Sequence, residues 1–207
     1  MAFKLESADI LVNINDRRDP ISSVKRWASG PYEHVFIYLG DVALLVGLEI
    51  IRIPMLFESD GDGVVIESLS SRYGQKVVVM RLKSEFDRRR VPAVTREAIR
   101  LAEDPQAKYD YACIRKYVIP RLVIRKFGLP LAVKYHRDPL MICSEAGFEI
   151  FYRGGLVDIL GPGCTPPMPG DFVTDSPLLE EVNCGVLSGD WVWVVKTLTN
   201  TPGWHRQ

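Results

Sequence analysis

The fold is decided by two short segments that lie far apart in the chain, Tyr32-Glu33-His34-Val35-Phe36-Ile37-Tyr38-Leu39-Gly40 and Met141-Ile142-Cys143-Ser144-Glu145-Ala146-Gly147-Phe148. The first predicts a polar turn that leads into a β-strand, because β-branched and aromatic residues follow the histidine. The second predicts an apolar approach to an amphipathic helix that begins at the cysteine. A thiol at a helix start and an imidazole on a strand provide a nucleophile and a base. We therefore expect these two segments to meet in space.

The rest of the chain alternates predicted strands with short helices. Strands are predicted over 8–13, 64–68, 76–82 and 191–196, and helices over 20–28, 95–103 and 110–127, with the cysteine helix ending near residue 152. The apolar stretch 42–56 contains only two charges, Glu49 and Arg52, and its pattern fits a strand, a helix or an inserted excursion. No internal repeat is present, so the pattern indicates a single α+β domain over residues 1–207.

Composition and charge limit the classes of function. The 207 residues are 47% hydrophobic, and 26 Lys and Arg balance 26 Asp and Glu. Because nucleic-acid binding usually requires a basic excess, we expect no nucleic-acid partner. The four cysteines form no close metal-ligand pair, and we expect neither a metal nor an organic cofactor. The chain start lacks a signal-peptide pattern and no apolar run of membrane-spanning length occurs, which predicts a cytoplasmic protein.

Several segments carry a family resemblance when they are considered in order. They are Ala8-Asp9-Ile10-Leu11, Trp27, the histidine strand, Val65-Ile66-Glu67-Ser68, Tyr109-Asp110-Tyr111, Ile142-Cys143-Ser144-Glu145, and the loop to Asp171. Together they resemble the circularly permuted papain-like cysteine hydrolases, a YiiX-like group related to NlpC-type peptidases and to lecithin:retinol acyltransferase-like enzymes. In the unpermuted relatives the cysteine helix comes first. Here His34 precedes Cys143, as in the permuted branch.

The resemblance implies a fold and a set of site residues. The fold is a permuted papain-like, NlpC-type arrangement in which a small antiparallel sheet packs against the helix that bears the nucleophile. Cys143 matches the nucleophile, His34 the general base, and Glu67 the third residue that orients the imidazole. The backbone N–H of Cys143, assisted by Tyr109 or Tyr111, would stabilise an oxyanion.

One departure from the family pattern affects the third catalytic residue. The family passes from the histidine strand to the glutamate strand through a short turn, whereas residues 41–63 intervene here. This insertion either lengthens the hairpin or forms a lid. Because it changes which carboxylates can approach the histidine, Asp41 and Glu49 remain alternatives to Glu67.

A basic segment raises a second question of function. Residues 115–137 interleave Lys and Arg with apolar side chains, and no Asp or Glu occurs between residues 111 and 137. Such a stretch can lie on an anionic membrane surface or bind an acidic or lipid-like acyl substrate. The alternative is an ordinary helix with one face on the core. We expect a cysteine-dependent hydrolase that acts on a peptide, amide or acyl ester; the alternative is a non-catalytic domain that binds lipid or a partner through residues 115–137.

Overall fold

The computed structural model describes residues 3–15, 31–61, 63–83, 88–110, 141–155, 157–161 and 167–192. Several sequence predictions fall outside these ranges. They are the helix over 20–28, the helix over 110–127 except for residue 110, the site residue Tyr111, the basic segment 115–137, and residues 193–196 of the predicted strand 191–196.

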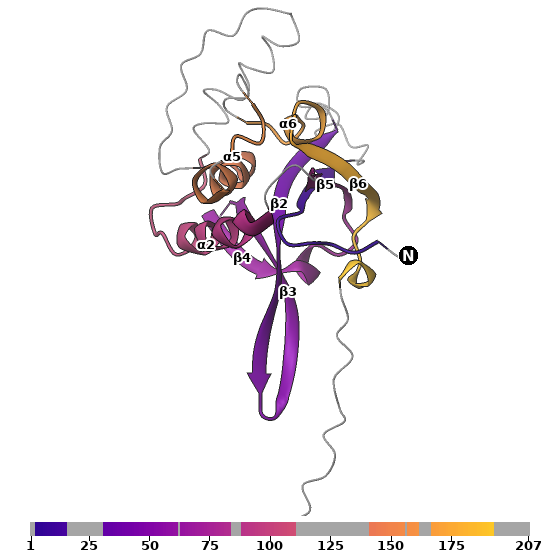
Figure 1. The fold of residues 1–207 in the computed structure, drawn as a ribbon, viewed down its shortest axis with the longest axis vertical. Coiled ribbons are helices and arrows are strands. Elements are labelled where there is room, and N and C mark those ends of the chain that lie inside the picture. Colours follow the sequence, from indigo (N-terminus) through magenta and orange to yellow (C-terminus); the bar gives the residue numbers. More distant parts are fainter. Residues whose placement is uncertain are drawn as a thin grey trace, which may run out of the picture.

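A six-stranded antiparallel sheet forms the centre of the molecule (Figure 1). Its strands are β1 (Ile10–Ile14), β2 (Tyr32–Val46), β3 (Glu49–Asp60), β4 (Gly63–Ser68), β5 (Lys76–Leu82) and β6 (Leu179–Val186). They are arranged in the order β4-β3-β2-β1-β5-β6. The predicted strands 64–68 and 76–82 are confirmed, and the fold is α+β, as expected.

The start of β1 departs from the prediction because of a backbone turn at Ala8. Ala8 has a φ of 73°, in the left-handed region that a Cβ atom disfavours. Its N–H donates to the carbonyl of Tyr38 at 2.8 Å, which holds the turn against β2. The strand therefore begins at Ile10 rather than at residue 8. Glycine is the residue that such a φ favours.

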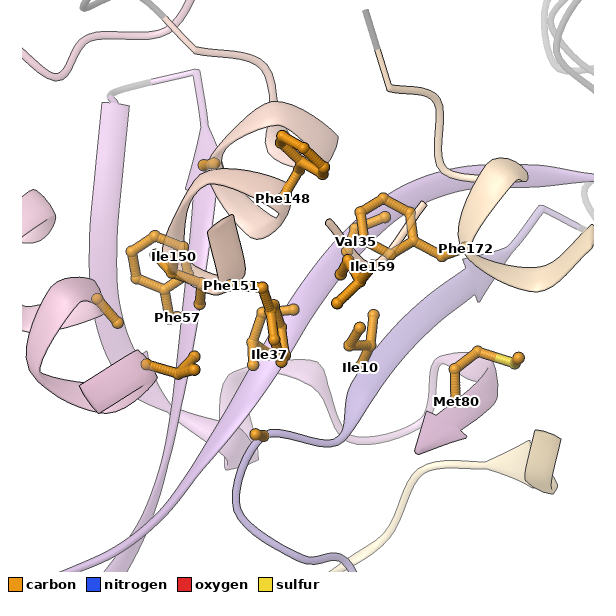
Figure 2. Packing of buried hydrophobic residues seen from close by; sticks show 14 of the residues in the cluster. Ile10, Val35, Ile37, Phe57, Met80, Phe148, Ile150, Phe151, Ile159 and Phe172 are labelled. Atoms are coloured by element: carbon orange, nitrogen blue, oxygen red, sulfur yellow. The ribbon is translucent and has the colours of Figure 1, made fainter. Parts of the chain in front are cut away.

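Helices cover one face of the sheet. They are α2 (Val91–Ala102), α5 (Cys143–Glu149) with its continuation η4 (Ile150–Gly155), and the short α6 (Asp171–Thr174). Figure 2 shows the core between them, where Phe151 and Phe172 pack against Val35 and Ile37 of β2. Helix α2 begins four residues before its predicted start at Thr95. The cysteine helix begins at Cys143, as predicted, and its continuation ends at Gly155.

A close contact fixes α2 against η4. A Cβ atom at Gly154 would lie 2.6 Å from the carbonyl oxygen of Ala93 and 2.9 Å from the Cα of Val94. Only glycine allows the two helices to approach this closely.

The opposite face of the sheet has a smaller core. It contains Leu11, Phe36 and Val79, and the 3-10 helices η1 (Leu69–Arg72) and η5 (Gly189–Trp191) border it. Within the described ranges, no helix is long and apolar enough to cross a membrane.

The ambiguous stretch 42–56 forms the outer part of a long β-hairpin. Strands β2 and β3 stay paired from Phe36/Glu58 to Val46/Glu49, with an irregularity next to Gly40. Residues 41–54 extend beyond the other strands, because β1 pairs only as far as Ile37 and β4 only as far as Met55. We call residues 41–54 the arm. In Figure 1 it projects away from α2 and α5, so the insertion lengthens the hairpin.

Candidate active site

His34 lies near the start of β2, beside the point where β2 and β3 separate. The pairing of these strands begins at Phe36/Glu58, although β3 itself continues to Asp60 in its pairing with β4. The edge of β2 at His34 and Val35 is therefore not occupied by β3. Another part of the chain can approach the sheet there.

Cys143 occupies this position as the first residue of α5. The segment before it is held in place by Met141, whose carbonyl accepts a hydrogen bond from the Ser59 hydroxyl at 2.9 Å and whose N–H donates to the Lys108 carbonyl at 2.9 Å. The helix start is also fixed internally, because the N–H of Ile142 donates to the Glu145 carboxylate at 2.9 Å. Cys143 is buried, with 6% of the residue exposed.

The thiol and the imidazole interact directly. Burial raises the pKa of the Cys143 thiol, but the charge of His34, a hydrogen bond with it, and backbone N–H groups of Val35 and Ser144 outweigh burial and lower the pKa below its ordinary value. Burial lowers the pKa of His34, but Cys143 and Glu58 outweigh this effect and raise it to about 10. Both shifts favour a thiolate and an imidazolium, the reactive form of a cysteine nucleophile.

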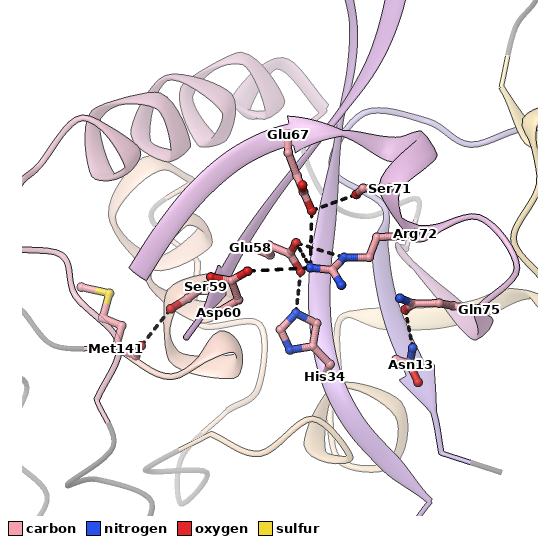
Figure 3. A network of polar contacts seen from close by, with 10 residues as sticks. All are labelled: Asn13, His34, Glu58, Ser59, Asp60, Glu67, Ser71, Arg72, Gln75 and Met141. Atoms are coloured by element: carbon pink, nitrogen blue, oxygen red, sulfur yellow. Dashed lines mark hydrogen bonds and ion pairs between the residues drawn. The ribbon is translucent and has the colours of Figure 1, made fainter. Parts of the chain in front are cut away.

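Glu58, and not Glu67, contacts the imidazole ring. The Nε2 atom of His34 lies 2.6 Å from Oε2 of Glu58, whose side chain is fully buried, while the side chain of His34 is 21% exposed (Figure 3). This contact leaves Nδ1 as the ring nitrogen for the thiol. Burial raises the pKa of Glu58, but hydrogen bonds with His34, Glu67 and Arg72 outweigh it and lower the pKa to about 2. Glu58 is therefore a carboxylate at neutral pH.

Glu67 lies one strand further out and belongs to the surroundings of Glu58. Arg72 donates from Nε to Oε1 of Glu58 at 3.0 Å, and its Nη2 lies 3.4 Å from Oε1 of Glu67. Ser71 donates its hydroxyl hydrogen to Glu67 at 2.8 Å. A hydrogen bond with Glu58 is the first cause that raises the pKa of Glu67 above its ordinary value. The role predicted for Glu67, contact with the imidazole, is thus occupied by Glu58.

The other candidate residues lie in different places. Asp41 accepts a hydrogen bond from the Tyr38 hydroxyl at 2.7 Å, and Glu49 lies at the end of the arm opposite Val46. The backbone beside Tyr109 runs along Met141, because the N–H of Asp110 donates to the Met141 carbonyl at 3.4 Å. Tyr109 therefore lies next to the approach to Cys143.

Glu58 and Arg72 are the two site residues that the sequence did not identify. Glu58 stands in Leu56-Phe57-Glu58-Ser59, a carboxylate that follows apolar residues just before a turn. A charge in an apolar strand is a signal of a buried ion pair. This signal can be recognised only after residues 49–60 have been assigned as a strand, and the sequence pattern left that assignment open.

Comparisons with known proteins support the fold. No family model matches the chain, and no curated protein matches it in sequence. Among solved structures, it is similar to the crystal structure of the metalloprotein YiiX from Escherichia coli O157:H7, with 16% identity and a TM-score of 0.55. The similarity covers 89% of this chain and 100% of the YiiX chain. The chain therefore has a YiiX-like fold.

Over the described part of the chain, no three His, Cys, Asp or Glu side chains are arranged to hold a metal ion. The carboxylate nearest to His34 belongs to Glu58, and the Arg72 guanidinium already neutralises it. The Arg72 guanidinium therefore occupies the carboxylate of Glu58, which a metal ion beside His34 would need as a ligand.

Proposed function

We propose that this chain is a cysteine-dependent hydrolase with a permuted papain-like, NlpC-type fold. The observation that supports it is the series of contacts from the Cys143 thiol to the His34 imidazole and from there to the buried Glu58 carboxylate. A structural cysteine in an apolar core would need no charged partner. The order of the chain, with His34 before Cys143, agrees with the permuted branch that the sequence resembles.

The residues have distinct roles in the proposed reaction. The Cys143 thiolate attacks a carbonyl carbon, and the imidazolium of His34 donates its Nδ1 proton to the leaving nitrogen or oxygen, which leaves an acyl-thioester. Water then attacks the thioester while His34 accepts its proton, and the thiolate is released. Glu58 holds the ring orientation and stabilises the imidazolium. The N–H of Cys143, with Tyr109 nearby, stabilises the oxyanion.

The substrate class is an amide or an acyl ester. A peptide, an isopeptide or an N-acyl amide suits this chemistry, and transfer of the acyl group to an acceptor other than water is a variant of the second step. The reaction as proposed needs no cofactor.

Selective alkylation tests the proposal without knowledge of the substrate. The protein is treated with iodoacetamide between pH 5 and 9, and mass spectrometry resolves the four cysteines. Cys184, which is free and exposed, is the internal reference for an ordinary thiol. We expect labelling of Cys143 to persist well below pH 8 and to be lost in His34→Ala. Labelling of Cys143 no faster than that of Cys184, unchanged in His34→Ala, would contradict the proposal and favour a non-catalytic binding domain.

A further inference from the structure

The arm, residues 41–54, exposes an unusual amount of apolar surface. Its exposed apolar side chains are Val42, Leu44, Leu45, Val46, Leu48, Ile50 and Ile51, and Leu48 at the turn is fully exposed. Together they present an apolar surface of several hundred Å², at or above the largest patch of a typical monomer. A surface of this kind usually marks a binding site.

Both faces of the arm are apolar. Residues opposite each other in an antiparallel pair share a face. Leu44 and Ile51 lie on one face, while Leu45 and Ile50 lie on the other. A binding groove on a protein would cover one face of the ribbon, whereas here the apolar residues surround the tip. The surroundings that suit the tip are therefore apolar on all sides.

The composition of the tip favours lipid over protein. Its exposed side chains are aliphatic, and the segment 42–51 contains no Trp, Tyr, Phe or Arg. Binding energy between proteins depends mainly on Trp, Tyr and Arg, and Leu and Val are under-represented among such residues. Branched aliphatic side chains, by contrast, are well suited to acyl chains.

Two features limit how far the tip can enter a bilayer. Beyond Ile37 and Met55 the arm has only two strands, so both of its edges carry backbone groups that need water. Glu49 is next to the turn, and its charge must also stay hydrated. Insertion is thus restricted to the boundary between headgroups and acyl chains, a depth of about 5–10 Å.

Arg52 lies at the height of the headgroups in this arrangement. It is four residues from Leu48, which corresponds to about 13 Å along an extended strand. The Leu45/Ile50 pair lies closer to the tip than Arg52, which pairs with Ala43. A guanidinium at this height meets lipid phosphates while the apolar tip meets acyl chains.

We propose that the arm is a membrane-binding element whose tip, Leu45 to Ile50, inserts into the headgroup and acyl boundary of a lipid bilayer. This inference is independent of the proposed catalytic site, because Cys143 and His34 are not part of the arm.

Vesicle binding tests the proposal on the full chain. Vesicles of phosphatidylcholine alone carry no net charge, so binding to them measures apolar insertion rather than electrostatic attraction. We expect the wild-type chain to co-sediment with these vesicles with little dependence on NaCl. The triple variant Leu45→Ser, Leu48→Ser, Ile50→Ser should bind at least tenfold more weakly. The matched controls Ile99→Ser and Val186→Ser, each at an exposed apolar position outside the arm, should bind as wild type does.

A second measurement does not depend on loss of binding. In Leu48→Trp, the emission of the new indole should shift to the blue and be quenched by phosphatidylcholine brominated on its acyl chains, relative to the wild-type background. The absence of binding to neutral vesicles would overturn the proposal. Binding to anionic vesicles alone would also overturn it, if the triple variant still binds and added salt removes the binding. A concentration-dependent dimer that the triple variant abolishes, without vesicle binding, would overturn it in favour of a second copy of the chain.

Discussion

Replacement of Glu58 by glutamine should reduce the reactivity of Cys143 without unfolding the site. Glutamine keeps the size of the side chain and removes the negative charge 2.6 Å from Nε2 of His34. A hydrogen bond to a charged group contributes about 1.5–3 kcal/mol, and a neutral one about 0.5–1.5 kcal/mol. The loss is therefore about 1–2 kcal/mol in the stability of the imidazolium. It corresponds to about a 5- to 30-fold smaller ratio of the thiolate–imidazolium pair to the neutral pair.

The assay is the rate of Cys143 alkylation at pH 6, with Cys184 in the same sample as reference. We expect Glu58→Gln to slow the alkylation of Cys143 by up to about 30-fold and to leave the alkylation of Cys184 unchanged. Glu67→Gln is the matched control. Because the Glu67 carboxylate is partly exposed and contacts Ser71 and Arg72, while Glu58 contacts the imidazole, the rate should stay within about twofold of wild type.

A role of Glu58 as the partner of the imidazole is refuted if Cys143 of Glu58→Gln is alkylated at the wild-type rate with the same pH profile, while the circular dichroism and the urea midpoint are unchanged. It is also refuted if Glu67→Gln slows Cys143 as much as Glu58→Gln does, because Glu67 would then act as the partner of the imidazole.

Three further predictions concern pH, charge and packing. The rate of hydrolysis should fall as pH rises through about 10, because the imidazole of His34 then loses the proton that the leaving group needs. The rate of Cys143 alkylation should not fall, since alkylation needs no proton donor. A rate of hydrolysis that stays constant through pH 11 would exclude His34 as the general acid. Arg81→Met should lower the free energy of unfolding by about 3–5 kcal/mol, because it leaves the buried Asp9 carboxylate without its cation. Arg100→Met, which breaks an exposed ion pair with Glu97, should lower it by under about 1 kcal/mol. Equal urea midpoints for the two variants would contradict this difference. Gly154→Ala should cost about 1–3 kcal/mol by thermal unfolding, because the new methyl group would lie 2.6 Å from a backbone oxygen, and Gly189→Ala, whose nearest contact is at 3.6 Å, should be close to neutral.

The elements that the sequence predicted well are those in which local pattern and burial agree. Strand β5 is dense in β-branched residues and lies inside the sheet, so its pattern and its environment give the same assignment. The cysteine helix ends in two glycines, and the structure ends it there. His34 and Cys143 were also predicted to meet, and the structure places them in hydrogen-bond contact.

The elements that the sequence did not predict depend on long-range contacts. The arm has no clear alternation of polar and apolar residues, because neither of its faces packs on the core, so periodicity could not assign it. The identity of the imidazole's partner depends on the register between β2 and β3, in which Phe36 lies opposite Glu58. A local pattern does not contain this register, and a shift along β3 would have selected another carboxylate.

Strand β2 has a consequence for the reach of the proposed enzyme. The same continuous strand carries His34 near one end and Leu45 near the other. Eleven residues separate them, which is about 36 Å along an extended strand. If the tip of the arm rests in a bilayer and β2 stands along the membrane normal, Ala43, the partner of Arg52, lies at the height of the headgroups, nine residues from His34. The thiol is then held about 30 Å above the headgroups. A bond within the lipid itself would then be out of range, and the acyl or amide group that reaches Cys143 would belong to a molecule that extends well beyond the membrane surface.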